Sequence, residues 1–149
     1  MSWPERKEEL KSQLCRILVR TGALRFGTFT LTSGRLSPYY IDLRLIPSFP
    51  EAFSEICEMY AEVITNEVGM EGFDRVAGIP IAGIPFASAL AYRLRKPFIF
   101  VRKEEKPHGR KKRIEGVLMP GDRVLLVDDL ITTGGSLLGA VKAVRAEGG

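Results

Sequence analysis

The sequence is poor in metal-binding and cross-linking residues: one histidine and two cysteines, Cys15 and Cys57, among 149 residues. A single histidine excludes a multi-histidine metal site. Both cysteines fall at apolar helical positions, which predicts core packing rather than a disulfide or a metal site. No apolar run approaches the ~20 residues of a membrane span. The charged N-terminus lacks the apolar core of a signal peptide, so we expect a reducing, cytoplasmic location and no membrane partner.

The composition is that of a soluble globular protein, 45% hydrophobic and 27% charged, and its length fits one domain. The formal net charge of +4 is unevenly distributed, because segment 102–113 alone carries +5. A basic run of this kind is usually a solvated face or a patch for anionic surfaces, and His108 within it can be a plain surface histidine.

The periodicity of apolar residues predicts an α/β fold. A capping box at Ser2 starts a helix that Gly22 ends, and two short strands around residues 29–31 and 39–43 suggest a hairpin. After residue 47, buried strands alternate with helices, which favours a mainly parallel, doubly wound sheet. The strands are expected at 75–79, 98–101 and 124–127, with a short one at 115–119, and the later helices at 50–69, 86–95 and from 137.

Ligands of such sheets lie beyond the carboxyl ends of the strands, where loops 80–85, 102–115 and 128–136 are expected. We predict a single domain over 1–149, with an N-terminal helix and hairpin in 1–46 and the core in 47–149. A crossover helix normally leads to a further parallel strand. The last helix has none after it, so we expect the core to be incomplete at its C-terminus.

One stretch combines a buried strand with polar chemistry: Val124–Val127, then Asp128-Asp129, then Thr132-Thr133-Gly134-Gly135-Ser136 before a helix. Backbone N–H groups of a glycine-bearing turn, the helix dipole and hydroxyls together make a phosphate cradle. The adjacent carboxylates suit the hydroxyls of a ribose or a divalent cation. An ordinary strand-to-helix turn with capping hydroxyls is the structural alternative, but two carboxylates after an apolar strand are costly if unused.

This stretch resembles the 5-phosphoribosyl 1-diphosphate (PRPP) motif of type I phosphoribosyltransferases. Two further segments resemble the orotate phosphoribosyltransferase family. Segment 29–42 is similar to its N-terminal hood, through Thr32-Ser33-Gly34-Arg35 and Tyr39-Tyr40-Ile41-Asp42. Segment 102–109 is similar to its catalytic loop. The resemblance implies the type I phosphoribosyltransferase fold, transfer of phosphoribose from PRPP to orotate in pyrimidine biosynthesis, and Mg²⁺ held mainly by PRPP. It also implies a homodimer in which loop 102–113 acts in the partner's site.

The resemblance also assigns residues. Lys103, Asp128 and Asp129 are the expected catalytic residues, and Thr132, Tyr40 and Ile41 meet orotate. The expected PRPP-binding set is Arg102, Lys103, Lys106, His108, Asp128, Asp129, Leu130, Ile131, Thr132, Thr133, Gly134, Gly135 and Ser136. The chemistry agrees, since diphosphate gathers negative charge as it leaves the anomeric carbon and cations stabilise it. Packing within a strand is the alternative for Tyr39 and Tyr40.

The chain departs from the family pattern at three places. Thr32 and Ala82 stand where many members carry lysines, so we expect the diphosphate to depend more on segment 102–113. A C-terminal portion that supplies an arginine for the orotate carboxylate is not in the sequence, which predicts poor use of orotate. Two other functions stay open: a phosphoribosyltransferase for another base, and a PRPP-sensing regulator that binds nucleic acid. We expect no nucleic-acid partner, because 1–25 is only one helix.

Overall fold

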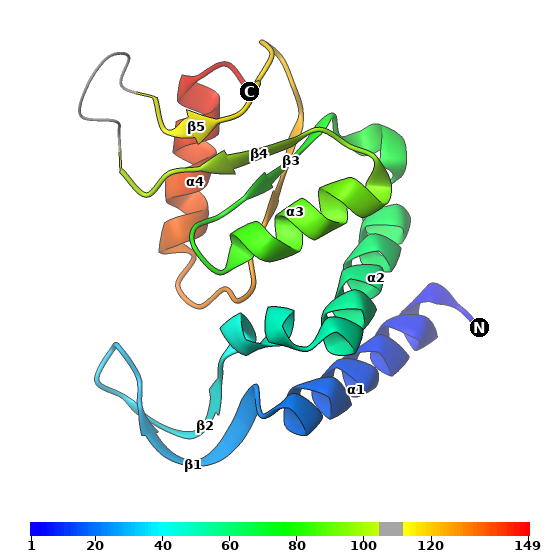
Figure 1. The fold of residues 1–149 in the computed structure, drawn as a ribbon, viewed down its shortest axis with the longest axis vertical. Coiled ribbons are helices and arrows are strands. Elements are labelled where there is room, and N and C mark those ends of the chain that lie inside the picture. Colours follow the sequence, from blue (N-terminus) through cyan, green and yellow to red (C-terminus); the bar gives the residue numbers. More distant parts are fainter. Residues whose placement is uncertain (105–111) are drawn as a thin grey trace. The chain divides into compact units, whose positions relative to one another are not determined.

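The computed structural model describes residues 1–104 and 112–149 (Figure 1). The chain divides into two compact units, Met1–Met59 and Tyr60–Gly149, with the division inside helix α2. No helix in the described residues has the length and apolarity needed to cross a bilayer.

The first unit begins with helix α1 (Trp3–Thr21), and both of its ends are fixed by the sequence. The Ser2 N–H donates to Glu5 Oε2 at 2.7 Å while the Ser2 hydroxyl accepts from the Glu5 N–H, which completes the predicted capping box. Gly22 adopts φ +78° and ends the helix, as glycine at this position commonly does. Both predicted ends are therefore confirmed.

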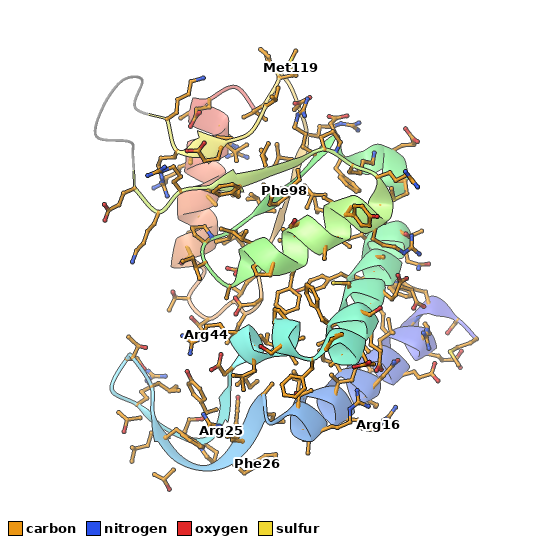
Figure 2. All side chains as sticks on the ribbon, viewed as in Figure 1. Arg16, Arg25, Phe26, Arg44, Phe98 and Met119 are labelled. Carbon is orange, nitrogen blue, oxygen red and sulfur yellow. The ribbon has the colours of Figure 1, made fainter. Side chains whose placement is uncertain are left out.

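The predicted hairpin is present, with its strands shifted toward the N-terminus. Strand β1 (Leu24–Thr30) pairs antiparallel with β2 (Leu36–Ile41), and a register shift lies between Phe26 and Phe29. Arg25 and Phe26 stand on β1 (Figure 2), and Phe26 is 73% exposed. The second strand ends before Leu43, because a 3₁₀ helix, η1 (Leu43–Ser48), starts there with the Asp42 side chain as its cap.

The second unit holds a four-stranded sheet in the order β5-β4-β3-β6. Strands β3 (Arg75–Gly78), β4 (Phe98–Val101) and β6 (Val124–Val127) are parallel, and β5 (Ile114–Glu115) runs antiparallel to β4. The helical elements are α2 (Pro50–Glu67), the 3₁₀ turn η2 (Met70–Gly72), α3 (Gly83–Leu94) and α4 (Gly135–Ala146). The predicted α/β, mainly parallel sheet is confirmed.

Side-chain alternation puts α3 and α4 on opposite faces of this sheet (Figure 1). Ala77, Ile79 and Ile99 pack in one buried cluster with Ala140 and Val144 of α4. Gly78 faces the other way, where an added Cβ would lie 3.0 Å from Ile84 Cα in α3. The sheet is thus doubly wound, and the carboxyl ends of β3, β4 and β6 meet at one edge, where the sequence predicted the ligand loops.

Three sequence predictions need correction. Helix α3 begins at Gly83 rather than at 86, and the strand expected at 115–119 is reduced to Ile114–Glu115 because Gly116 turns away at φ +105°. Cys15 is exposed, so core packing was wrong for it, whereas Cys57 is buried as predicted. Burial raises the pKa of the Cys57 thiol to about 11, with a smaller contribution from Glu58.

Candidate active site

The loop between β6 and α4 has the geometry expected of a phosphate cradle. Gly134 caps α4 at φ +83°, a conformation that glycine adopts without strain, and the Gly135 N–H donates to Thr133 Oγ1 at 3.4 Å. A hollow of about 70 Å³ lies against Asp128 and residues 130–137. Residues 130–133 are exposed, so the positive end of the α4 dipole opens onto an accessible space.

Asp128 is held at the strand end by three neighbours. The Tyr60 hydroxyl donates to the Asp128 carbonyl at 2.6 Å, and the Asp129 N–H donates to Asp128 Oδ1 at 2.8 Å. Gly83 comes so close that an added Cβ would lie 2.8 Å from the Val127 carbonyl oxygen and 3.0 Å from Asp128 Oδ1. The first turn of α3 therefore packs directly against the carboxylate.

The environment of Asp128 raises its pKa to about 6. Partial burial is the main cause, followed by the hydrogen bond and the charge of Asp129, and the Asp129 N–H opposes them. A carboxylate that titrates near neutral pH can accept a hydrogen bond when ionised and donate one when protonated. Such a group in a ligand loop is a candidate functional residue.

A larger cavity of about 870 Å³ adjoins the cradle and is lined by both apolar and charged side chains. Its charged residues are Arg102, Lys103, Glu104 and Arg113, and it shares Gly135 and Ser136 with the cradle. Arg102 forms an ion pair with Glu115 at 3.2 Å, while Lys103 is exposed. The structure thus brings two of the predicted diphosphate ligands beside the cradle; Lys106 and His108 lie outside the described residues.

The expected loop 80–85 contributes to the same cavity. Pro80, Ile81 and Ile84 line it, and Ala82 caps α3 without a side-chain hydrogen bond. This segment contributes backbone and apolar surface to the cavity but no charged side chain.

The orotate residues predicted in the hairpin belong to the unit Met1–Met59. The Tyr40 ring lies 5.7 Å from Phe29, and the Arg25 guanidinium sits 5.8 Å from the centre of the Tyr40 ring. Arg44 donates to the Tyr40 hydroxyl at 3.5 Å and pairs with Asp42, which lowers the pKa of that carboxyl. Tyr40 is therefore well packed within its strand pair, Ile41 is half-buried, and Thr32 stands exposed in the turn.

Sequence reasoning missed Tyr60 and Gly83. Tyr60 looks like any member of the apolar stripe of α2, and it meets a residue 68 positions away in the chain. Gly83 lies between Pro80 and Pro85, where a glycine is readily taken as part of a turn. Within the described residues, no group of three or more histidine, cysteine, aspartate or glutamate side chains is placed to hold a metal ion.

Comparison with known proteins agrees with this geometry. Residues 49–149 match the family model of the phosphoribosyl transferase domain. The orotate phosphoribosyltransferase of Pyrobaculum aerophilum is 48% identical over 132 residues, which cover 89% of this chain and 66% of that protein. The enzyme of that name from Pyrococcus abyssi is 42% identical over 139 residues, covering 93% of this chain and 75% of that protein.

Solved structures show the same similarity. The crystal structure of orotate phosphoribosyltransferase from Aeropyrum pernix superimposes with a TM-score of 0.80 at 36% identity, covering 91% of this chain and 75% of that one. Against the first two curated relatives the chain spans just under two thirds of their length, 66% in Pyrobaculum and 64% in Ruegeria. The chain carries a phosphoribosyl transferase domain, has the predicted type I fold and is similar to several orotate phosphoribosyltransferases. The chain therefore belongs to the orotate phosphoribosyltransferase family.

Proposed function

We propose that this chain transfers the 5-phosphoribosyl group from PRPP to orotate, forming orotidine 5′-monophosphate and diphosphate in pyrimidine biosynthesis. The observation that carries this proposal is the pairing of the cradle at 128–136 with a cation-lined cavity that shares its Gly135 and Ser136. A ribose 5-phosphate that also carries a diphosphate needs both sites side by side. The names of the relatives point to orotate as the acceptor.

Different groups of residues bind the different parts of the two substrates. The N–H groups and hydroxyls of residues 132–136 hold the 5-phosphate, and Asp128 and Asp129 accept hydrogen bonds from the ribose hydroxyls. Arg102, Lys103, Lys106 and His108 hold the diphosphate and stabilise its charge as its bond to the anomeric carbon breaks. A ring nitrogen of orotate, held by Thr132 and by the backbone near Tyr40 and Ile41, forms the new bond to that carbon.

Mg²⁺ is the proposed cofactor. Mg²⁺ usually takes one or two protein carboxylates together with substrate phosphates. Asp128 lines the hollow of the cradle and Asp129 follows it in the chain, so these carboxylates would be the protein's share of the ligands. The chemistry supplied by a bound ion would be an offset for the negative charge that the diphosphate gathers as it leaves. We assign most of its ligands to PRPP.

The proposed working form is a cytoplasmic homodimer in which segment 102–113 of each subunit serves the partner's site. The two ends of this segment are tied together, because the Arg102 N–H donates to the Arg113 carbonyl at 2.6 Å. Both cysteines are free thiols, in keeping with a reducing compartment.

An assay of diphosphate release from PRPP, run base by base, tests the proposal. Release with orotate, and none with hypoxanthine, adenine or uracil, is the expected result. Release with one of the other bases instead would assign the chain to a different phosphoribosyltransferase. Tight PRPP binding without release for any base would leave a PRPP sensor and refute the enzyme.

A further inference from the structure

The cavity beside the cradle has an arginine that the family resemblance does not assign. Arg113 stands where the basic segment returns to the sheet, next to β5, and lines the cavity together with Arg102 and Lys103. The same cavity is also lined by Ile79, Pro80 and Ile81, which carry no charge. Every described cation in the lining therefore comes from the β4–β5 connection.

The contacts of Arg113 fix its position without neutralising its charge. Its Nε donates to the Arg102 carbonyl at 3.0 Å and its Nη1 to the Gly139 carbonyl at 3.5 Å. Glu147 accepts from the backbone N–H groups of Arg113 and Ile114 at 2.9 and 3.2 Å. In residues 1–104 and 112–149, no carboxylate pairs with the Arg113 guanidinium.

Two other half-buried arginines of this unit each form an ion pair with a carboxylate. Arg102 is bound to Glu115 at 3.2 Å, and Arg75, which is half-buried like Arg113, is bound to Asp122. Partly buried cations are normally matched by an anion, because desolvation penalises an unpaired charge. Arg113 thus adds a positive charge to the cavity lining, and the one carboxylate among the described lining residues, Glu104, forms no ion pair with it.

We propose that Arg113, unlike the rest of segment 102–113, acts in its own subunit and binds the diphosphate end of PRPP there, taking over from the lysine that many family members carry where Ala82 stands. The inference rests on the proposed function. It follows from the layout of the cavity. The cradle proposed for the 5-phosphate shares Gly135 and Ser136 with the cavity, Arg113 lines the same cavity, and the lining at 79–81 is uncharged. A planar guanidinium suits two phosphate oxygens at once.

Calorimetric titration with three ligands in Mg²⁺ tests this assignment: PRPP, inorganic diphosphate and ribose 5-phosphate. In Arg113→Gln we expect affinity for PRPP and diphosphate to fall about 10-fold or more, the loss typical of one charged hydrogen-bonding group, with ribose 5-phosphate unchanged. Arg145→Gln is the matched control, because Arg145 is exposed in the last turn of α4 away from the cavity lining. It should bind all three ligands like the unaltered chain.

A rescue variant separates charge from structure. In the double variant Arg113→Gln, Ala82→Lys, a cation returns next to the uncharged lining residue Ile81, and we expect diphosphate affinity to recover most of the loss. A purely structural Arg113 would not be replaced by a lysine at 82. Thermal unfolding of each variant checks that Arg113→Gln remains folded. Arg113→Lys keeps the charge, so its affinity for diphosphate should lie between the affinities of the unaltered chain and of Arg113→Gln.

The outcomes of these titrations distinguish the role of Arg113 from the proposed function of the chain. Unchanged diphosphate binding in Arg113→Gln, or no recovery with Ala82→Lys, would overturn the role of Arg113 and leave the proposed function standing. Failure of the unaltered chain to bind PRPP while diphosphate still binds in an Arg113-dependent way would refute the proposed function and keep the anion site. Failure to bind either would overturn both.

Discussion

At the scale of single residues, the two adjacent aspartates of the cradle are not equivalent, because Asp128 packs against α3 and its pKa is raised to about 6. We expect affinity for ribose 5-phosphate to fall as the pH drops through about 6, since protonated Asp128 no longer accepts from two ribose hydroxyls. The ligand's phosphate also titrates with a pKa near ~6, so Asp128→Asn supplies the background profile. Identical pH profiles for the two proteins would contradict the assignment.

The raised pKa of Asp128 also makes the free energy of unfolding depend on pH. A carboxyl whose pKa is higher in the folded state favours folding when protonated, so its contribution to stability is lost as pH rises between the unfolded value of 3.8 and about 6. Above pH 6, Asp128→Asn should therefore have a larger free energy of unfolding than the unaltered chain, and below 3.8 this gain should vanish. A cost in stability of this sign is common at functional sites.

Tyr60 is the residue that holds the Asp128 backbone in place, through a hydrogen bond of 2.6 Å to its carbonyl. Tyr60→Phe keeps the ring, which lies 5.9 Å from Phe86, and removes the hydroxyl. We expect the free energy of unfolding to fall by about 1 kcal/mol, with a several-fold weaker affinity for ribose 5-phosphate. Tyr92→Phe is the control, since Tyr92 is 89% exposed, and should change neither quantity in denaturation and titration experiments.

At the scale of elements, the site depends on how closely the start of α3 approaches the end of β6. Gly83→Ala would place a Cβ 2.8 Å from the Val127 carbonyl oxygen, and a backbone atom cannot move aside as a flexible side chain can. We expect a loss of about 1–3 kcal/mol in stability and weaker binding of ribose 5-phosphate, because either α3 or the Asp128 strand end must shift.

A second glycine-to-alanine change gives the matched comparison for stability. Gly139 lies inside α4, and an added Cβ there meets nothing within 4 Å. Gly139→Ala should raise the free energy of unfolding by about 0.5–1 kcal/mol through helix propensity alone. Equal effects of the two changes in chemical denaturation would mean that the close approach at Gly83 is relaxed in solution.

Local sequence signals were sufficient to predict the ends of one helix but not the start of another. Ser2 and Gly22 predicted both ends of α1, because capping acts between residues that are neighbours in sequence. The start of α3 was missed because Pro80 and Pro85 suggested a turn. Pro85 is tolerated there since it lies in the first helical turn, where N–H groups have no partner within the helix.

At the scale of the whole molecule, alternation of helix and strand predicted the parallel sheet, but not the contacts that assemble the site. The order of apolar residues, carboxylates, hydroxyls and glycines in 124–136 was sufficient to predict the strand, the glycine-bearing turn and the helix that follows, because these parts are neighbours in the chain. Tyr60 meeting Asp128, and Arg113 lying between Arg102 and Gly139, depend on long-range packing that no local pattern encodes.

The proposed dimer makes a prediction that only an assembly of two subunits can satisfy. His108→Ala alters the basic segment and Asp129→Asn alters the cradle, so each homodimer alone should be nearly inactive in diphosphate release with orotate. If the segment serves the partner, a mixed dimer has one site with both parts intact, and an exchanged equal mixture should regain about one quarter of full activity. A segment that served its own subunit would give no recovery. Arg113→Gln mixed with Asp129→Asn is the matched control, because Arg113 acts in its own subunit and the mixture should gain nothing.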